Sequence, residues 1–468
     1  MDKIKFGTDG WRAIIAKDFT VENVMRVAEA TAIWLLKQKQ NPSVVLGHDC
    51  RFGGELFASA VAWVLCTKGI TTQLAKGFVS TPMISLGTVK LKADLGIIIT
   101  ASHNPPEYNG FKLKGNYGGP LLPSLVAEIE SLIPEKSSYS HLDIHIGQFE
   151  KSGLLEYTDL ETMYCKQVES AFDLDLIRNS NLRLAYDAMY GSGQNVLRRL
   201  LPDITFLHCE YNPSFMGQAP EPIHKNLGEF SEMIRLAGNI DCGLVTDGDA
   251  DRLGFYDNEG NFVDSHHIIL LLIHYLHKYK GQSGKVCVAF STTPRVEKLC
   301  QKYSLPVETV KIGFKYICEI MIKEDVLLGG EESGGIAIKG HIPERDGIWM
   351  GLVIWEFMAK SGKTLNELID EVYEVVGPFS FERSDLKIKE EVKQRVLENC
   401  RKGKYDSFGK YKVVKTEDLD GYKYFFDNGD WLMIRASGTE PVLRTYAESS
   451  DRETAFDILR EGEKTLLN

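Results

Sequence analysis

Three aspartates at alternate positions could together bind a metal ion. Asp247, Asp249 and Asp251 lie in the string TDGDADR, directly after the apolar string CGLV. Alternate residues of an extended segment point to the same side, so we expect the three carboxylates to converge. Converging carboxylates repel one another, and oxygen-only ligands favour Mg²⁺ as the ion that relieves the repulsion. The alternative is a solvated acidic turn; a Ca²⁺ loop is excluded, because Arg252 and Asn258 stand where it needs glycine and glutamate.

A serine in a second polar string could carry a phosphoryl group. Ser102 lies in TASHNPPEYNGFK, after the apolar string LGIII, and ligands of open α/β sheets bind at such strand ends. A hydrolase nucleophile prefers G-x-S-x-G, which this string does not match. A phosphate on Ser102 could instead add a ligand to the metal, and Lys112 could supply a cation or a proton-transfer group. The alternative is a serine that only caps a turn.

Two further strings could hold a sugar. GGEESGG places Glu331, Glu332 and Ser333 between glycines, and carboxylates accept hydrogen bonds from sugar hydroxyls. The alternative for this string is a glycine-rich entry to a helix. The next string, KGHIPERDG, adds polar candidates that equally fit an exposed surface: Lys339, His341, Arg345 and Asp346.

Cations and hydroxyls near both ends of the chain could bind phosphate. The string RASGTEPVLRTY combines guanidinium groups, hydroxyls and a flexible turn, which suit a phosphate dianion; its candidates are Arg435, Ser437, Gly438, Thr439 and Arg444. FGTDGWRA is another polar turn with a cation and contains Gly7, Thr8, Asp9 and Arg12. Lys315 follows a glycine turn in VKIGFKYI, where a solitary lysine equally fits an exposed surface.

Composition narrows the class of protein. The net charge of −11 argues against a nucleic-acid partner, because phosphate backbones attract basic surfaces. The longest apolar run, IILLLI, is much shorter than the roughly 18 residues of a membrane span, so we expect no membrane partner. The N-terminal string carries no signal-peptide pattern, and nine cysteines without a CxxC pair indicate a reducing compartment. We therefore expect a cytoplasmic protein.

Helical and strand patterns alternate along most of the chain, which indicates an α/β fold. We expect helices at 21–36 and 54–69, strands at 44–49, 70–75 and 95–100, and further α/β series from 182–188 and 286–291. The Gly-Pro in VVGPF separates a smaller, charged α+β unit. The predicted domains are 1–148 with the serine loop, 149–252 with the metal loop, 253–374 with the sugar loop and 375–468 with the phosphate loop.

Three apolar strands each run directly into a dense polar loop: LGIIIT into ASHNPPEYNGFK, CGLVT into DGDADR, and DVLLGG into EESGG. One such loop in each unit predicts three related modules that contribute to a shared cleft.

In this order the strings FGTDGWR, TASHNPPEYNGFK, DGDADR, GGEESGG and RASGTEP resemble the α-D-phosphohexomutases over the whole chain. The resemblance implies four domains around a central cleft, three of them related α/β domains with mixed sheets and the last a smaller α+β domain. It also implies an enzyme that moves a phosphoryl group between two hydroxyls of a hexose phosphate through a phosphoserine and a bisphosphate.

The resemblance assigns roles residue by residue. Ser102 is similar to the family's phosphoserine, and Asp247, Asp249 and Asp251 with the Ser102 phosphate are similar to the Mg²⁺ ligands. The implied catalytic groups around the transferring phosphoryl are Arg12, His103, Lys112 and Arg252. The implied sugar-binding residues are Lys315, Glu331 and Ser333. The implied clamp on the other phosphate consists of Arg435, Ser437, Gly438, Thr439 and Arg444.

The string GEESGG resembles the phosphoglucomutase branch, since mannose-using members often read GEMSGH and glucosamine-using members GEQSGH. We expect exchange between glucose 1-phosphate and glucose 6-phosphate, with Mg²⁺, glucose 1,6-bisphosphate as intermediate, and a monomer or homodimer. The alternatives are a phosphomannomutase or dual-specificity mutase, then a phosphoglucosamine mutase or phosphopentomutase. A sugar phosphatase or bisphosphate synthase and a non-catalytic sensor are rival classes. The family's histidine is absent at Gly335, so His341 or Lys339 are candidates for its role.

Overall fold

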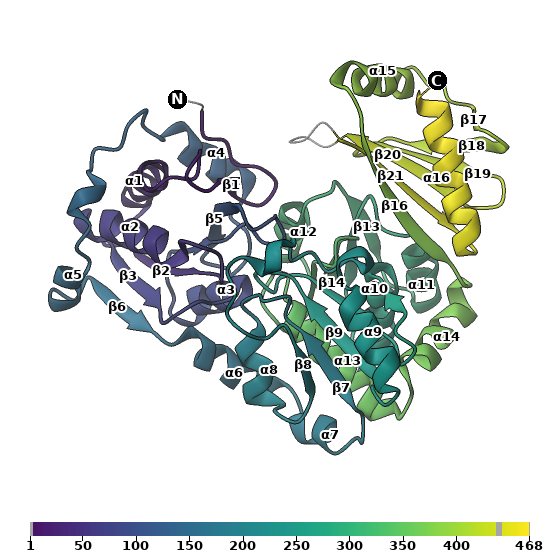
Figure 1. The fold of residues 1–468 in the computed structure, drawn as a ribbon, viewed down its shortest axis with the longest axis horizontal. Coiled ribbons are helices and arrows are strands. Elements are labelled where there is room, and N and C mark those ends of the chain that lie inside the picture. Colours follow the sequence, from purple (N-terminus) through teal and green to yellow (C-terminus); the bar gives the residue numbers. More distant parts are fainter. Residues whose placement is uncertain (1–2, 437–441, 468) are drawn as a thin grey trace. The chain divides into compact units, whose positions relative to one another are not determined.

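The computed structural model describes residues 3–436 and 442–467. The chain divides into two compact units, a larger one made of Met1–Cys287 and Gly313–Ile369 and a smaller one made of Val288–Ile312 and Asp370–Asn468 (Figure 1). Four sheets follow one another along the chain.

The first sheet is mixed and places the serine loop. Its strands, in spatial order, are β1 (Trp11–Ile14), β5 (Tyr108–Gly115), β4 (Leu95–Ile99), β2 (Ser43–His48), β3 (Thr71–Ala75) and β6 (Leu155–Thr158). Strand β5 runs antiparallel to both of its neighbours, whereas β4, β2, β3 and β6 run parallel to one another. The polar segment between β4 and β5 therefore turns back at the end of a central strand.

Both faces of this sheet are buried, which explains the continuous apolar strings. Val44 and Leu46 of β2 belong to the core formed with α1 (Val21–Gln38) and α2 (Gly54–Thr67). Gly47 points to the other face, where α3 (Thr81–Lys90) packs on β2 and β4.

The second sheet places the metal loop. Its order is β11 (Phe262–Val263), β10 (Leu253–Tyr256), β9 (Cys242–Thr246), β7 (Leu184–Asp187) and β8 (Thr205–Leu207). Strands β7, β8 and β9 are parallel, and β10 turns back antiparallel to β9, so the aspartate string connects β9 to β10. The helices α6 (Leu160–Ala171) and α7 (Leu174–Arg178) precede β7, whereas α8 (Gln194–Leu200) and α9 (Gly228–Ala237) lie between the strands.

The third sheet has the order β13 (Val307–Val310), β12 (Lys285–Ala289), β14 (Val326–Gly330) and β15 (Ile336–Ile338). Strands β14 and β15 form an antiparallel hairpin whose turn is the EESGG string. The helices of this region are α10 (Ser265–His274), α11 (Arg295–Tyr303), α12 (Phe314–Met321), α13 (Gly347–Ser361) and α14 (Leu365–Val376).

The smaller unit contains an antiparallel sheet with its own core. The strand order is β16 (Ser380–Lys387), β21 (Val442–Ser449), β20 (Trp431–Ala436), β19 (Tyr422–Phe426), β18 (Tyr411–Glu417) and β17 (Ser407–Phe408). Residues of α15 (Glu390–Arg401) and α16 (Arg452–Leu467) close the core of this sheet.

The fold class predicted from the sequence is confirmed: three α/β regions with mixed sheets precede a smaller β-rich domain. The helices predicted at 21–36 and 54–69 correspond to α1 and α2. The strands predicted at 44–49, 70–75 and 95–100 correspond to β2, β3 and β4, and the two later α/β series begin with β7 and β12. The apolar run IILLLI lies inside α10, and among the described residues no helix combines the length and the hydropathy that a membrane span needs. The exact domain boundaries stay a prediction.

Candidate active site

The loop after β4 holds Ser102 in an unusual conformation. Ser102 is fully buried, and its φ of 53° lies in the left-handed region, which costs a non-glycine residue about 1–3 kcal/mol. The hydroxyl of Thr100 accepts a hydrogen bond from the Ser102 amide at 2.9 Å. A residue held this way needs surrounding contacts that impose the conformation.

Arg51 supplies those contacts. It is 1% exposed, and its guanidinium donates to four backbone carbonyls at 2.6 to 3.0 Å; these belong to Ser102, Asn104, Pro105 and Tyr108. A guanidinium presents five donors in a fixed plane, so one side chain can hold several carbonyls of one loop. Arg51 therefore fixes the backbone at the serine and along the loop that follows it.

Asp49 completes this support. One carboxylate oxygen accepts from the Arg51 amide at 2.9 Å, and the other lies 3.4 Å from the Arg51 Nε and accepts from the Thr100 hydroxyl. Burial raises the pKa of Asp49 to about 6, although the Arg51 charge opposes the shift. Neither Asp49 nor Arg51 is among the residues predicted from the sequence, although the string DCR follows β2 as the other polar loops follow their strands.

The three aspartates do converge, but not in the predicted way. The segment after β9 is a turn rather than an extended strand, with Ala250 at a φ of 55° and its amide bonded to the Asp247 carbonyl at 3.0 Å. One carboxylate oxygen from each of Asp247, Asp249 and Asp251 lies within 4.8 Å of the others, and all three residues are buried. The turn brings them together because it reverses the chain between β9 and β10.

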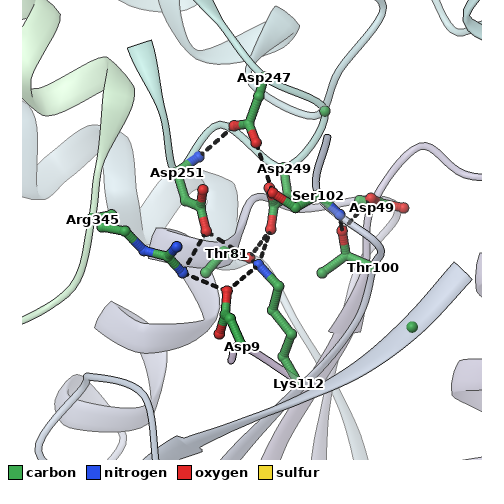
Figure 2. Close-up of polar contacts among 12 residues, drawn as sticks. Asp9, Asp49, Thr81, Thr100, Ser102, Lys112, Asp247, Asp249, Asp251 and Arg345 are labelled. Carbon is green, nitrogen blue, oxygen red and sulfur yellow. Dashed lines mark hydrogen bonds and ion pairs between the residues drawn. The ribbon is translucent and has the colours of Figure 1, made fainter. Parts of the chain in front are cut away.

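The carboxylate oxygens suit a hard divalent cation. Ser102 Oγ donates to Asp247 Oδ2 at 2.8 Å, which joins the serine loop to the metal loop (Figure 2). In the described part of the chain, Asp249 Oδ1 and Asp251 Oδ1 are buried and have no hydrogen-bond partner. Buried carboxylate oxygens without partners are costly, and an oxygen-only set fits Mg²⁺. The residues present therefore fit the predicted ion.

Lys112 lies on the other side of these carboxylates. Its Nζ is 2.7 Å from Asp249, 3.1 Å from Asp251 and 2.9 Å from Asp9. Burial works against the ammonium ion, but these carboxylates outweigh it and raise the pKa of Lys112 above its usual value. The structure thus places Lys112 as a cation among three carboxylates.

The charges around Asp247 differ from those around Asp249. Burial and the neighbouring carboxylates of Asp249 and Asp251 raise the pKa of Asp247 well above its usual range. Burial also disfavours ionised Asp249, but Lys112 and the Thr81 hydroxyl more than compensate and lower its pKa. On the Asp247 side the charge of Arg252 opposes these effects without outweighing them.

Arg345 is a second fixed cation in this network. Its Nη2 lies 2.5 Å from Asp9 and 2.8 Å from Asp251 (Figure 2). Next to it, Lys114 and Glu344 form a buried pair at 2.6 Å. The sequence allowed Arg345 to be a surface charge; the structure buries it in the site.

The GEESGG string forms the turn between β14 and β15, so the alternative of a helix entry is wrong. Glu331 is 5% exposed and accepts a hydrogen bond from the Gly313 amide at 2.8 Å. Burial raises the pKa of Glu331 to about 7, against the influence of Arg345. Ser333 lies half-buried in the same turn.

The other predicted groups of the larger unit lie around the serine loop or beside it. Arg12 donates to the Asn104 side chain at 2.7 Å, and His103 Nδ1 lies 3.3 Å from Ser102 Oγ. Burial, then the charges of Arg252 and Arg12, lower the pKa of His103, so its ring is neutral. Arg252 Nε is buried and without a hydrogen-bond partner among the residues described.

Lys315 lines a cavity of about 160 Å³ together with Asp9, Thr8 and Glu130.

The residues considered in place of the missing histidine have other partners. His341 is 2.8 Å from Asp346 and stacks on Trp349, and Lys339 pairs with Asp325.

The predicted phosphate clamp belongs to the smaller unit. Arg435 of β20 and Arg444 of β21 are directly opposite in the antiparallel register. Like charges at such a position are unfavourable unless anions compensate them. Asp420 lies 3.5 Å from Arg435 and Asp385 lies 3.9 Å from Arg444, and a bound phosphate would add to this compensation. The other clamp candidates, Ser437, Gly438 and Thr439, lie outside the described residues.

Comparison with known proteins places this site in context. The chain matches the description "Phosphoglucomutase/phosphomannomutase" in all four domains: the alpha/beta/alpha domains I, II and III over residues 3–140, 162–260 and 264–376, and the C-terminal domain over residues 388–461.

Relatives match over nearly the whole length. A phosphoglucomutase/phosphomannomutase from Thermococcus kodakarensis is 30% identical and covers 98% of each chain. A phosphoglucosamine mutase from Caldanaerobacter subterraneus is 30% identical over 97% of each. A crystal structure from Thermus thermophilus, assigned there as a phosphomannomutase, is 32% identical over 100% of each chain, with a TM-score of 0.87. An Aspergillus fumigatus N-acetylphosphoglucosamine mutase with GlcNAc-6P and magnesium shares the fold alone, at 16% identity over 99% of this chain and 95% of that one, and a TM-score of 0.59.

Proposed function

We propose that this chain, which belongs to the phosphoglucomutase/phosphomannomutase family, interconverts glucose 1-phosphate and glucose 6-phosphate through a phosphoserine at Ser102. Membership makes it a phosphohexomutase, an intramolecular phosphotransferase of the isomerase class. The observation that supports the serine best is its contact with Asp247 at 2.8 Å, beside two carboxylate oxygens that have no hydrogen-bond partner in the described chain.

The proposed cycle has two transfers. A free hydroxyl oxygen of the hexose phosphate attacks the phosphorus on Ser102, the bond from phosphorus to Ser102 Oγ breaks, and the proton of the hydroxyl ends on Ser102 Oγ. The product is a hexose 1,6-bisphosphate and free Ser102. After the bisphosphate turns around, Ser102 Oγ attacks the other phosphorus and the bond from that phosphorus to the sugar oxygen breaks. The proton of Ser102 ends on this sugar oxygen, and the isomerised monophosphate is released. Such transfers depend mainly on positioning and electrostatic stabilisation.

Residues of the larger unit supply that stabilisation. Nearby carboxylates outweigh burial and raise the pKa of both Lys112 and Arg345, so these cations balance the carboxylates that a phosphate ester must approach. Glu331 accepts a sugar hydroxyl, and its burial strengthens that hydrogen bond. In the smaller unit, Arg435 and Arg444 bind the phosphate that is not transferred.

Asp247, Asp249 and Asp251, with the Ser102 phosphate, would hold Mg²⁺. The bound ion supplies neutralisation of phosphoryl charge, which lowers the barrier to transfer.

Glucose is proposed as the sugar because the turn reads GEESGG. Glucose and mannose differ at one hydroxyl, and a single hydrogen bond contributes about 0.5–1.5 kcal/mol, so we expect mannose phosphates to react more slowly rather than not at all. Glucosamine is the second candidate, because several relatives that match nearly the whole chain are phosphoglucosamine mutases.

Initial rates on the 1-phosphates of glucose, mannose and glucosamine, each with Mg²⁺ and a trace of the matching bisphosphate, test the proposal. A preference for glucose 1-phosphate supports the proposal. Equal or faster turnover of another sugar phosphate would make that sugar phosphate the substrate instead. Intact mass should show one phosphate on the wild type and none on Ser102→Ala, which should lose exchange. Robust turnover by Ser102→Ala would refute the carrier, and steady release of inorganic phosphate would indicate a phosphatase.

A further inference from the structure

Gly335 ends the turn between β14 and β15, and its backbone does not require glycine. Its neighbour Gly334 has a φ of 89°, where side chains are strained, but the φ of Gly335 lies outside that region. A Cβ built on Gly335 would lie 2.4 Å from Arg345 Cδ and 3.0 Å from its Cγ. The space beside Gly335 is therefore occupied by the aliphatic stem of Arg345.

The path of Arg345 is set at both ends. Its neighbour Asp346 caps α13 through the Trp349 amide at 3.0 Å and accepts hydrogen bonds from Tyr164 and His341 at 2.8 Å. These contacts hold the backbone at 345–346, so the side chain starts from a fixed point.

The other end of Arg345 is held by carboxylates. The side chain is 3% exposed, its Nη2 contacts Asp251 and Asp9, and its guanidinium lies 5.4 Å from the ring centre of Phe314. Only the Oδ2 atom of Asp251 makes this contact; Oδ1 has no hydrogen-bond partner in the described structure. Arg345 thus neutralises the Oδ2 side of the carboxylate, and the Oδ1 side faces Arg252 Nε at 3.9 Å without a hydrogen bond in the described structure.

We propose that Gly335 and Arg345 act as a pair, in which the missing side chain at 335 admits a positioning arginine to the phosphoryl-transfer site. Arg345 acts through Asp251 and Asp9, and its fixed charge reduces the negative field that a phosphate ester meets. The pairing deepens the proposed function and rests on it. It also explains how the chain dispenses with a histidine at 335: a ring there would collide with the stem of Arg345.

A double-mutant cycle tests the pairing. Gly335→Ala should displace Arg345, and Arg345→Ala should remove it, so each should lower kcat/KM at least tenfold for whichever hexose 1-phosphate reacts fastest. The double variant should fall within twofold of Arg345→Ala alone. If the double variant instead loses the product of the two single losses in kcat/KM, Gly335 has a separate role and the pairing is overturned. Gly228→Ala is the matched control, because a Cβ there meets open space, and it should retain wild-type rates.

Mn²⁺ binding to the unphosphorylated protein provides a readout without turnover. Removing a positive charge that contacts Asp251 should lower the Mn²⁺ dissociation constant at least fivefold in Arg345→Ala, in Gly335→Ala and in the double variant alike. Arg345→Lys, which keeps the charge, should stay within twofold of the wild type. Weaker Mn²⁺ binding in Arg345→Ala would show that the arginine only holds the loop together, and an unchanged constant in Gly335→Ala would separate the two residues. Either result overturns the proposal, whereas failure of the sugar assays alone would count against the proposed function.

Discussion

Replacing Arg51 should release the serine loop. Arg51 donates to four carbonyls at and after Ser102 and pairs with Asp49, and the side chains of Arg51 and Asp49 are fully buried. Methionine fills a similar volume without any donor, so Arg51→Met removes the hydrogen bonds and leaves the Asp49 charge buried. The left-handed conformation of Ser102 then loses the contacts that impose it.

The size of the effect follows from the buried pair. Removing one partner of a buried ion pair costs about 3–5 kcal/mol, because the remaining charge has no compensation. The pKa of Asp49 is already raised to about 6, and loss of Arg51 should raise it further. A raised carboxyl pKa means that the folded protein disfavours the ionised form. The protein is therefore more stable at low pH, and it loses this stability as the pH rises through that pKa. The destabilisation by Arg51→Met should therefore be larger at pH 8 than at pH 5.

Hydrogen exchange followed by mass spectrometry measures this locally. Peptides that cover residues 95–112 should exchange much faster in Arg51→Met, and kcat should fall at least tenfold. Arg26→Met is the matched control, since Arg26 is also buried and donates to the Pro134 carbonyl at 2.7 Å, away from the serine loop. It should leave the exchange of 95–112 and kcat unchanged.

A double variant tests whether the buried charge of Asp49 causes the loss of stability. Asp49→Asn combined with Arg51→Met leaves no buried charge, so part of the lost stability should return and its pH dependence should disappear. A double variant no more stable than Arg51→Met at pH 8, or slow exchange of 95–112 in Arg51→Met, would refute the clamp.

Three further predictions follow from the site. Chelation of divalent cations should abolish turnover and added Mg²⁺ should restore it, because the buried Asp247, Asp249 and Asp251 carboxylates fit such an ion; full activity after exhaustive chelation would contradict the metal site. The pKa of Glu331 is about 7 in the folded protein against an ordinary value of 4.5, so the neutral form stabilises the fold and this stability is lost as the pH rises. Between pH 5 and pH 8, Glu331→Gln should therefore gain up to about 3 kcal/mol of unfolding free energy relative to the wild type. A pH-independent difference in denaturant midpoint would contradict this. Arg435→Ala should raise KM for the hexose phosphate at least tenfold, whereas Arg452→Ala, which breaks an exposed pair with Glu382, should not; equal KM values would remove Arg435 from the clamp.

The sequence by itself determined the chemistry that the chain can perform and the order of its elements. Apolar β-branched strings identified β4, β9 and β14, and the polar strings that follow them identified Ser102, the three aspartates and Glu331. These signals are local: strand periodicity and the residues next to a strand end lie within about ten positions of one another. Candidate residues can therefore be read without knowing which strands are neighbours.

The tertiary structure decided how these residues meet. Arg51 supports a loop that begins about fifty positions later, and Arg345 reaches Asp9 at the other end of the larger unit's sequence. The aspartates converge through a turn with a left-handed Ala250, not through the extended alternation that their spacing suggested. Such contacts depend on sheet order and on the direction of buried side chains, neither of which leaves a periodic signal. Gly335 shows the reason most clearly, since its lack of a side chain has meaning only once Arg345 is seen to fill the space.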